Sequence, residues 1–238
     1  MSNFHNCKGP ISNKIRSLLT YLTAKPSEYD KITPKIEFWI EYVLRERFTT
    51  VDELVEGVSY VAWEGEGSYA SVGRFFKEFR DTPRRSEQAR SFITQLCSHI
   101  LRWFAITSVE YLGMGSYGGL IANNSGGKGF IRAASFVGHL IEHGLLSQEL
   151  LRQHLIKPLI NHYDEDPRYN QDTVWANAIY QLFIAAGSTL FQGLLEPEDV
   201  RLSFETLDAQ SRIVGIAGYD AARVKVWWTT HAKALRRS

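Results

Sequence analysis

Three features of this 238-residue sequence combine residue types and spacings that could do chemistry, and the first is His-Leu-Ile-Glu-His at 139–143. His139 and His143 are four residues apart, so they would share one face of a helix. Two imidazoles placed in this way can hold a zinc ion, with Glu142 as the base that activates a zinc-bound water. The sequence offers no identifiable third carboxylate ligand. We therefore interpret the stretch as an ordinary helical segment and keep a zinc hydrolase as the alternative.

The second feature is Gly-Gly-Lys-Gly-Phe at 126–130, which is similar to part of a phosphate-binding loop. The complete pattern needs a glycine five residues before Gly127 and a serine or threonine directly after Lys128. Ala122 and Gly129 occupy those two positions, and no strand pattern precedes them. We therefore predict a flexible loop here, and no nucleotide, metal or other cofactor for the protein.

The third feature is a set of basic residues that could contact phosphate groups. The formal net charge is only +1 at pH 7, so any basic surface for nucleic acid would have to be local. One basic neighbourhood lies within 74–90 and another within 223–237, although Glu78, Asp81 and Glu87 dilute the first. Charge alone favours solvated helix faces, so RNA binding needs further support.

The composition is that of an ordinary folded protein, with 44% hydrophobic and 22% charged residues. The first ten residues contain no apolar segment typical of a secretion signal, and no apolar run approaches the roughly 18 residues that span a bilayer. Cys7 and Cys97 give neither metal-ligand spacing nor a disulfide framework. We expect a cytoplasmic protein with no membrane partner, and the nucleus is the next possibility.

The elements that would position these residues are helices throughout. Apolar residues recur three and four positions apart, as at Leu18 and Leu22 or at Val72, Phe75 and Phe79. Alternating strand patterns are short and poorly bounded. The ten predicted helices run through 15–22, 34–44, 54–61, 72–79, 86–104, 131–141, 147–159 and 172–184, with two more that begin near 197 and 219.

Ten helices pair naturally into five antiparallel hairpins of roughly 40 residues each, the length of stacked two-helix repeats. We therefore predict an all-α fold, a right-handed α-solenoid of about five HEAT-like hairpins, with an irregular helical bundle as the alternative. The predicted organisation is a flexible N-terminus over 1–10 and a single domain over 11–238. Its one long interruption is a glycine-rich loop at 113–129. Gly144 is expected to cap the C-terminal end of the helix through 131–141.

Several of these segments resemble the middle domain of eukaryotic initiation factor 4 gamma. The segment 15–32, IRSLLTYLTAKPSEYDKI, is similar to the opening of that domain, and 136–151, FVGHLIEHGLLSQELL, is similar to its Phe-Ile-Gly block. The segments 89–100, 172–191 and 200–228 follow later blocks in the same order. The resemblance covers roughly residues 11 to 238, and it implies the same helical-repeat fold.

The resemblance also implies a function, that of a non-enzymatic scaffold in translation initiation or mRNA metabolism. Its expected partners are a DEAD-box RNA helicase of the initiation factor 4A type, RNA, and other translation or mRNA-metabolism proteins. The residues predicted to contact RNA are Arg80, Arg84, Arg85, Lys128 and Arg132, and those predicted to contact the helicase are Arg223, Lys225, Val226 and Trp227.

The last repeat departs from the family pattern, because Val226 stands where the family has a phenylalanine that helps to hold the helicase. Of the several arginines that usually precede the Phe-Ile-Gly block, only Arg132 remains. These departures keep a second hypothesis open. In that hypothesis the protein is a diverged protein–protein interaction module that kept the fold and lost the helicase contact.

Overall fold

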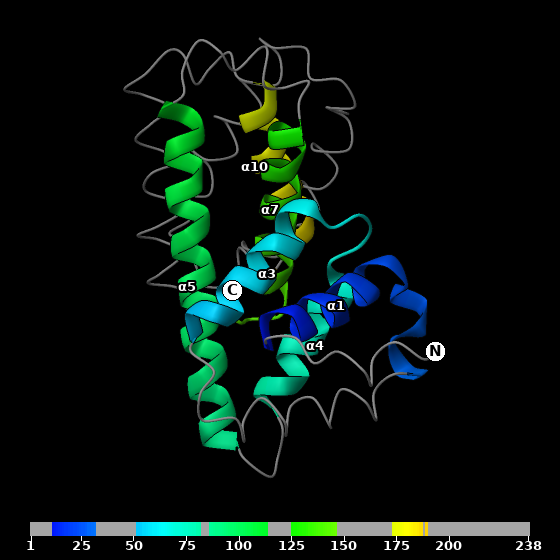
Figure 1. Cartoon of the computed structure of the whole chain (residues 1–238). Coiled ribbons are helices and arrows are strands. Elements are labelled where there is room, and N and C mark those ends of the chain that lie inside the picture. Colours follow the sequence, from blue (N-terminus) through cyan, green and yellow to red (C-terminus); the bar gives the residue numbers. More distant parts are fainter. Residues whose placement is uncertain are drawn as a thin grey trace, which may run out of the picture.

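In this computed structural model the described residues are 11–31, 51–81, 86–113, 125–146, 173–187 and 189. Within these ranges every regular element is a helix and none is a strand, which confirms the all-α prediction (Figure 1). The elements are α1 (Ile11–Ala24), the 3-10 helix η1 (Pro26–Glu28), α3 (Val51–Glu64), α4 (Ala70–Arg80), α5 (Ser86–Gly113), α7 (Ser125–Glu142) and α10 (Thr173–Ala186).

Helices α1 and α3 lie side by side and run in the same direction. The guanidinium of Arg16 lies over the ring of Tyr60, 3.5 Å from its centroid, and further along both segments the Ser68 amide donates to the Thr23 carbonyl at 3.2 Å. Helix α5 packs beside α3 in turn. The helices α1, α3 and α5 therefore form consecutive neighbours although other segments separate them in the sequence.

Helices α4 and α7 form a second parallel pair. Near the middle of α4 the ring of Phe76 meets that of Phe136 at 6.5 Å, and at its end Arg80 donates to the Gly144 carbonyl at 2.7 Å. Contacts that advance together along both helices require the same chain direction. Helix α4 also forms an antiparallel hairpin with α5, where the rings of Phe79 and Phe92 stack at 5.7 Å.

Helix α10 packs along α7 at very close range (Figure 1). The approach is possible because Gly138 has no side chain. A Cβ atom at Gly138 would lie 2.5 Å from the Leu182 carbonyl oxygen and 2.7 Å from the Cβ of Ala185. Beyond this point, the Thr189 hydroxyl donates to the Glu142 carbonyl at 3.3 Å. These contacts again advance together, so α7 and α10 are also parallel.

The core consists of the apolar stripes that the sequence pattern predicts. Burying each large apolar side chain contributes about 1.5–3 kcal/mol relative to leaving it in water. Aromatic rings dominate the centre, and Phe104 of α5 stacks on Phe130 of α7 at 5.5 Å. The largest fully buried side chains are Phe75, Phe76, Phe104, Phe130, Phe136, Leu19, Leu22, Leu54, Ile93, Leu96 and Ile100.

The prediction of a glycine-rich loop at 113–129 is wrong at both ends of that range. Gly113 is the last residue of α5, and α7 already begins at Ser125, so 125–129 is helical. Gly129 lies in the helix because its missing side chain makes room for the indole of Trp63, which a Cβ atom at Gly129 would strike. Packing of that partly buried indole against the core favours the helix over the loop that glycine composition suggests. Residues 114–124 lie outside the described residues.

The end of α7 confirms the predicted cap at Gly144. This residue has φ +62°, a left-handed conformation that glycine adopts without strain. Its amide donates to the Ile141 carbonyl at 2.9 Å, and the next amide, that of Leu145, donates to the Leu140 carbonyl at 3.0 Å. This is the Schellman arrangement, which satisfies carbonyls that the helix leaves open.

Several predictions fall outside the described residues. They are the N-terminus 1–10, the helix at 34–44, the helix through 147–159 and the two helices that begin near 197 and 219. The right-handed solenoid and the count of five hairpins stay predictions.

Candidate functional site

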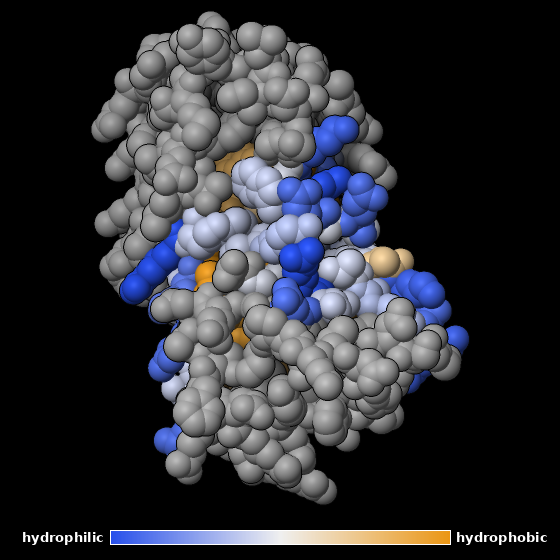
Figure 2. All heavy atoms as spheres, in the orientation of Figure 1, coloured by the Kyte–Doolittle hydropathy of each residue, from blue (hydrophilic) through white to orange (hydrophobic). Residues whose placement is uncertain are grey.

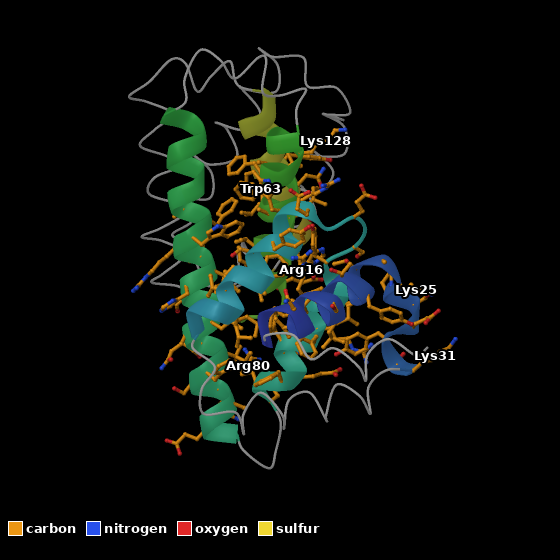
Figure 3. All side chains as sticks on the ribbon, viewed as in Figure 1. Arg16, Lys25, Lys31, Trp63, Arg80 and Lys128 are labelled. Atoms are coloured by element: carbon orange, nitrogen blue, oxygen red, sulfur yellow. The ribbon has the colours of Figure 1, made fainter. Side chains whose placement is uncertain are left out.

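Lys128 and Arg132, two of the predicted RNA contacts, lie one turn apart on the first part of α7. Figure 3 shows Lys128 and Trp63 in the upper part of the molecule. Lys128 is exposed. Arg132 is more enclosed, and its guanidinium donates to the Trp63 carbonyl at 3.5 Å and lies 3.6 Å from a Glu66 carboxylate oxygen. Arg132 thus binds the open carbonyl end of α3, and Lys128 is the freer of the two cations.

Arg80, a third predicted RNA contact, is engaged within the protein. Besides its bond to the Gly144 carbonyl, its guanidinium pairs with the Asp81 carboxylate at 2.9 and 3.2 Å. This hydrogen bonding lowers the pKa of Asp81, so the carboxylate stays ionised beside the arginine. The side chain of Arg80 is only 24% exposed. Its geometry is that of a link between the ends of α4 and α7.

These cations do not gather in one patch. Lys128 and Gly144 are 16 residues apart along α7 and its cap, a separation of about 24 Å at 1.5 Å per residue. Arg80 lies at the Gly144 end, and Figure 3 shows Lys128 in the upper part of the view and Arg80 in the lower part. The other predicted contacts, Arg84, Arg85, Arg223, Lys225, Val226 and Trp227, lie outside the described residues.

The His-Leu-Ile-Glu-His stretch spans the last turn of α7 and the first residue after it. The Nδ1 atom of His139 lies 2.7 Å from a Glu142 carboxylate oxygen. The His143 ring packs against Gly73 of α4, where a Cβ atom would lie 2.5 Å from the ring, and burial lowers the pKa of this imidazole. No group of three or more potential metal ligands occurs among the described residues. His139 and His143 thus serve contacts between and along helices in this structure.

Two residues that carry the resemblance at 29–32 have a structural role. The buried Tyr29 hydroxyl donates to Glu78 at 2.7 Å. Arg74 lies over the Tyr29 ring, 4.2 Å from its centroid, and donates to both Glu78 at 3.0 Å and Asp30 at 2.9 Å. Burial and the Glu78 carboxylate raise the pKa of Tyr29 well above its usual value. This network fastens the segment after α1 to α4.

Sequence reasoning missed a groove on the outer face of α1. The groove has a volume of about 500 Å³ and is lined by Arg16, Ser17, Thr20, Tyr21 and Ala24. Arg16 at one end stacks on Tyr60, and Lys25 at the other end lies 5.5 Å from the ring centroid of Tyr21. The spacing of the lining residues marks the polar side of an amphipathic helix, but only the tertiary structure brings Tyr60 of α3 to it.

Comparisons with known proteins give no further guidance to the site. The chain matches no protein-family model, and it shows no significant similarity to a curated protein or to a solved structure. Among the described helices, none combines the length and apolar character that crossing a bilayer requires.

Proposed function

We propose that the protein is a non-enzymatic helical scaffold that binds a DEAD-box RNA helicase of the initiation factor 4A type, RNA, or both, in translation initiation or mRNA metabolism. The observation that carries this proposal is the packing of α1 on α3 and α3 on α5, with α4 on α7 and α7 on α10. Two such series of neighbouring helices, in which the pairs α1 and α3, α4 and α7, and α7 and α10 are parallel, are typical of stacked hairpins, which present extended surfaces to partners. The order of the resembling segments supports the same reading.

The RNA part of this proposal rests mainly on Lys128 among the described predicted contacts. Arg80 and Arg132 donate to helix-end carbonyls and pair with carboxylates, so they retain less capacity for phosphate. These intramolecular bonds of Arg80 and Arg132 favour the second candidate function, a diverged protein–protein interaction module, because they leave fewer cations to bind RNA. The proposed location is the cytoplasm, where translation factors act.

The two candidates separate in a helicase assay with purified components. Under the first, adding the chain to a DEAD-box helicase of the initiation factor 4A type raises RNA-dependent ATP hydrolysis. The variant Trp227→Ala, at a predicted helicase contact, is expected to reduce that stimulation. The matched control Trp103→Phe keeps an aromatic ring against Trp63 and should leave the stimulation unchanged.

A helicase that neither binds the chain nor changes its ATP hydrolysis contradicts the first candidate. If the chain then captures protein partners from lysate after nuclease treatment, the second candidate stands. For the RNA arm, Lys128→Gln should weaken binding of a single-stranded oligonucleotide and reduce the salt dependence of that binding by about one phosphate contact.

A further inference from the structure

A groove on the outer face of α1 has one cation, Arg16, and one aromatic ring, Tyr21, in its lining, and Tyr60 and Lys25 lie against these two residues. The Arg16 guanidinium lies 3.5 Å from the centroid of the Tyr60 ring, which fixes its plane against that ring. At the other end the Lys25 ammonium lies 5.5 Å from the ring centroid of Tyr21. The groove has a volume of about 500 Å³ and is open to solvent, so it suits a ligand that lies along the surface.

From this arrangement we infer that the α1 groove binds single-stranded RNA, with one unpaired base stacked on the Arg16 guanidinium. Arginine planes and aromatic rings are the platforms on which unpaired bases stack. The Tyr60 ring packs against one face of the Arg16 guanidinium. The side chain of Tyr60 is 44% exposed, and among the described residues only one other large apolar side chain is as exposed. This inference rests on the RNA binding in the proposed function and assigns it to a place outside the predicted contacts.

The charges of the groove suit an RNA backbone at its two ends. Arg16 and Lys25 are nine residues apart on one helix and its end, about 13 Å at 1.5 Å per residue, so each can meet a different phosphate. Glu28 is the opposing charge, 3.9 Å from Lys25. Its carboxylate already accepts a hydrogen bond from the Tyr21 hydroxyl, which lowers the pKa of Glu28. The Arg16 end is therefore the more positive end.

The walls of the groove favour a base over an apolar peptide side chain. The leucines of α1 face the core, and Leu18, Leu19 and Leu22 are at most 2% exposed. They therefore form no apolar pocket for a ligand. What the groove presents instead is ring and guanidinium faces, with the exposed hydroxyls of Ser17 and Thr20 between them. The Ser17 hydroxyl donates to the Asn13 carbonyl at 2.8 Å and can accept a hydrogen bond from a base, whereas a threonine hydroxyl such as that of Thr20 can both donate and accept. In the view of Figure 2, hydrophilic residues predominate over the described part of the face that carries α1.

The test is fluorescence anisotropy with a labelled ten-nucleotide oligouridine, measured on the full chain at low salt. We expect Tyr60→Ala and Arg16→Gln each to weaken binding about 5- to 150-fold, the range found when a stacking platform is removed. Tyr60→Phe keeps the ring and should bind like the wild type. Arg102→Gln, which removes an exposed arginine from α5, is the matched control for loss of one charge and should cause only a small change.

Circular dichroism of each variant shows whether it is folded, and Tyr60 is exposed enough that its truncation should leave the fold intact. If Tyr60→Ala and Arg16→Gln bind as tightly as Arg102→Gln while Lys128→Gln binds weakly, the groove inference is wrong and RNA binding through α7 stands. If the wild type binds no oligouridine at low salt, the groove inference and RNA binding through α7 are both wrong. If a labelled acidic peptide binds and competes out the RNA, the groove belongs to a protein ligand and the inference is overturned.

Discussion

Replacing Gly138 by alanine tests the close approach of α7 and α10. The new Cβ atom would lie 2.5 Å from the Leu182 carbonyl oxygen and 2.7 Å from the Cβ of Ala185. Ordinary contacts between such atoms are about 3.5–4.0 Å, so α10 has to move away by about 1 Å. The obstacle is partly backbone, which cannot rotate aside as the end of a flexible side chain can.

The expected magnitude is the difference between two effects. Overpacking of a well-packed core costs typically 1–3 kcal/mol, and the upper part of that range applies because backbone must move. Alanine regains about 1 kcal/mol through its higher helix propensity. We therefore expect Gly138→Ala to lower the free energy of unfolding by about 2 kcal/mol. For a chain of this size that corresponds to a decrease in Tm of about 4–8 °C.

The assay is thermal and urea unfolding followed by circular dichroism at 222 nm. The control is Ser135→Ala, a small change on the same helix that meets no such obstacle, and its Tm should stay close to that of the wild type. A Gly138→Ala protein as stable as the wild type, or more stable, would show that α7 and α10 are not as close as the structure has them.

Three further predictions concern single side chains. Arg80→Ala removes the hydrogen bond to the Gly144 carbonyl and should lower the free energy of unfolding in urea by about 1 kcal/mol; an unchanged urea midpoint would contradict that role. Burial lowers the pKa of His143 in the folded protein. In the unfolded chain the same imidazole takes up a proton near pH 6.5. The neutral, buried imidazole therefore contributes its full stability above pH 6.5, and that stability is lost as the pH falls towards the folded-state pKa. The Tm should therefore fall between pH 7 and pH 5.5, and in His143→Asn this fall should be smaller. Burial raises the pKa of the Cys97 thiol to about 12, so in a Cys7→Ser protein a thiol reagent at pH 8 should react only after denaturant is added; fast reaction of the native protein would show that the core opens readily at α5.

The sequence predicted well those features that depend on local pattern. The apolar spacing of Val72, Phe75 and Phe79 is that of a helix with one buried face, and all three are buried in α4. The cap at Gly144 was predictable because few residues other than glycine adopt the left-handed conformation that ends a helix in this way.

What the sequence could not give depends on contacts between distant segments. Glycine composition predicted a loop through 129, but Gly129 is helical because Trp63, 66 positions earlier in the chain, occupies the space beside it. The family resemblance, together with its charge, predicted Arg80 as an RNA contact, yet its partners include a carbonyl 64 positions away. The α1 groove needs Tyr60 of α3 beside Arg16, a neighbour that no spacing within one helix reveals.

The central claim, that this protein is a scaffold that binds a DEAD-box helicase of the initiation factor 4A type, RNA, or both, is tested most directly by a pull-down from lysate with the purified full chain, with and without nuclease. The account predicts that a DEAD-box helicase of the initiation factor 4A type stays bound after nuclease treatment and that RNA is recovered when nuclease is left out. Recovery of neither the helicase nor RNA at low salt would contradict it.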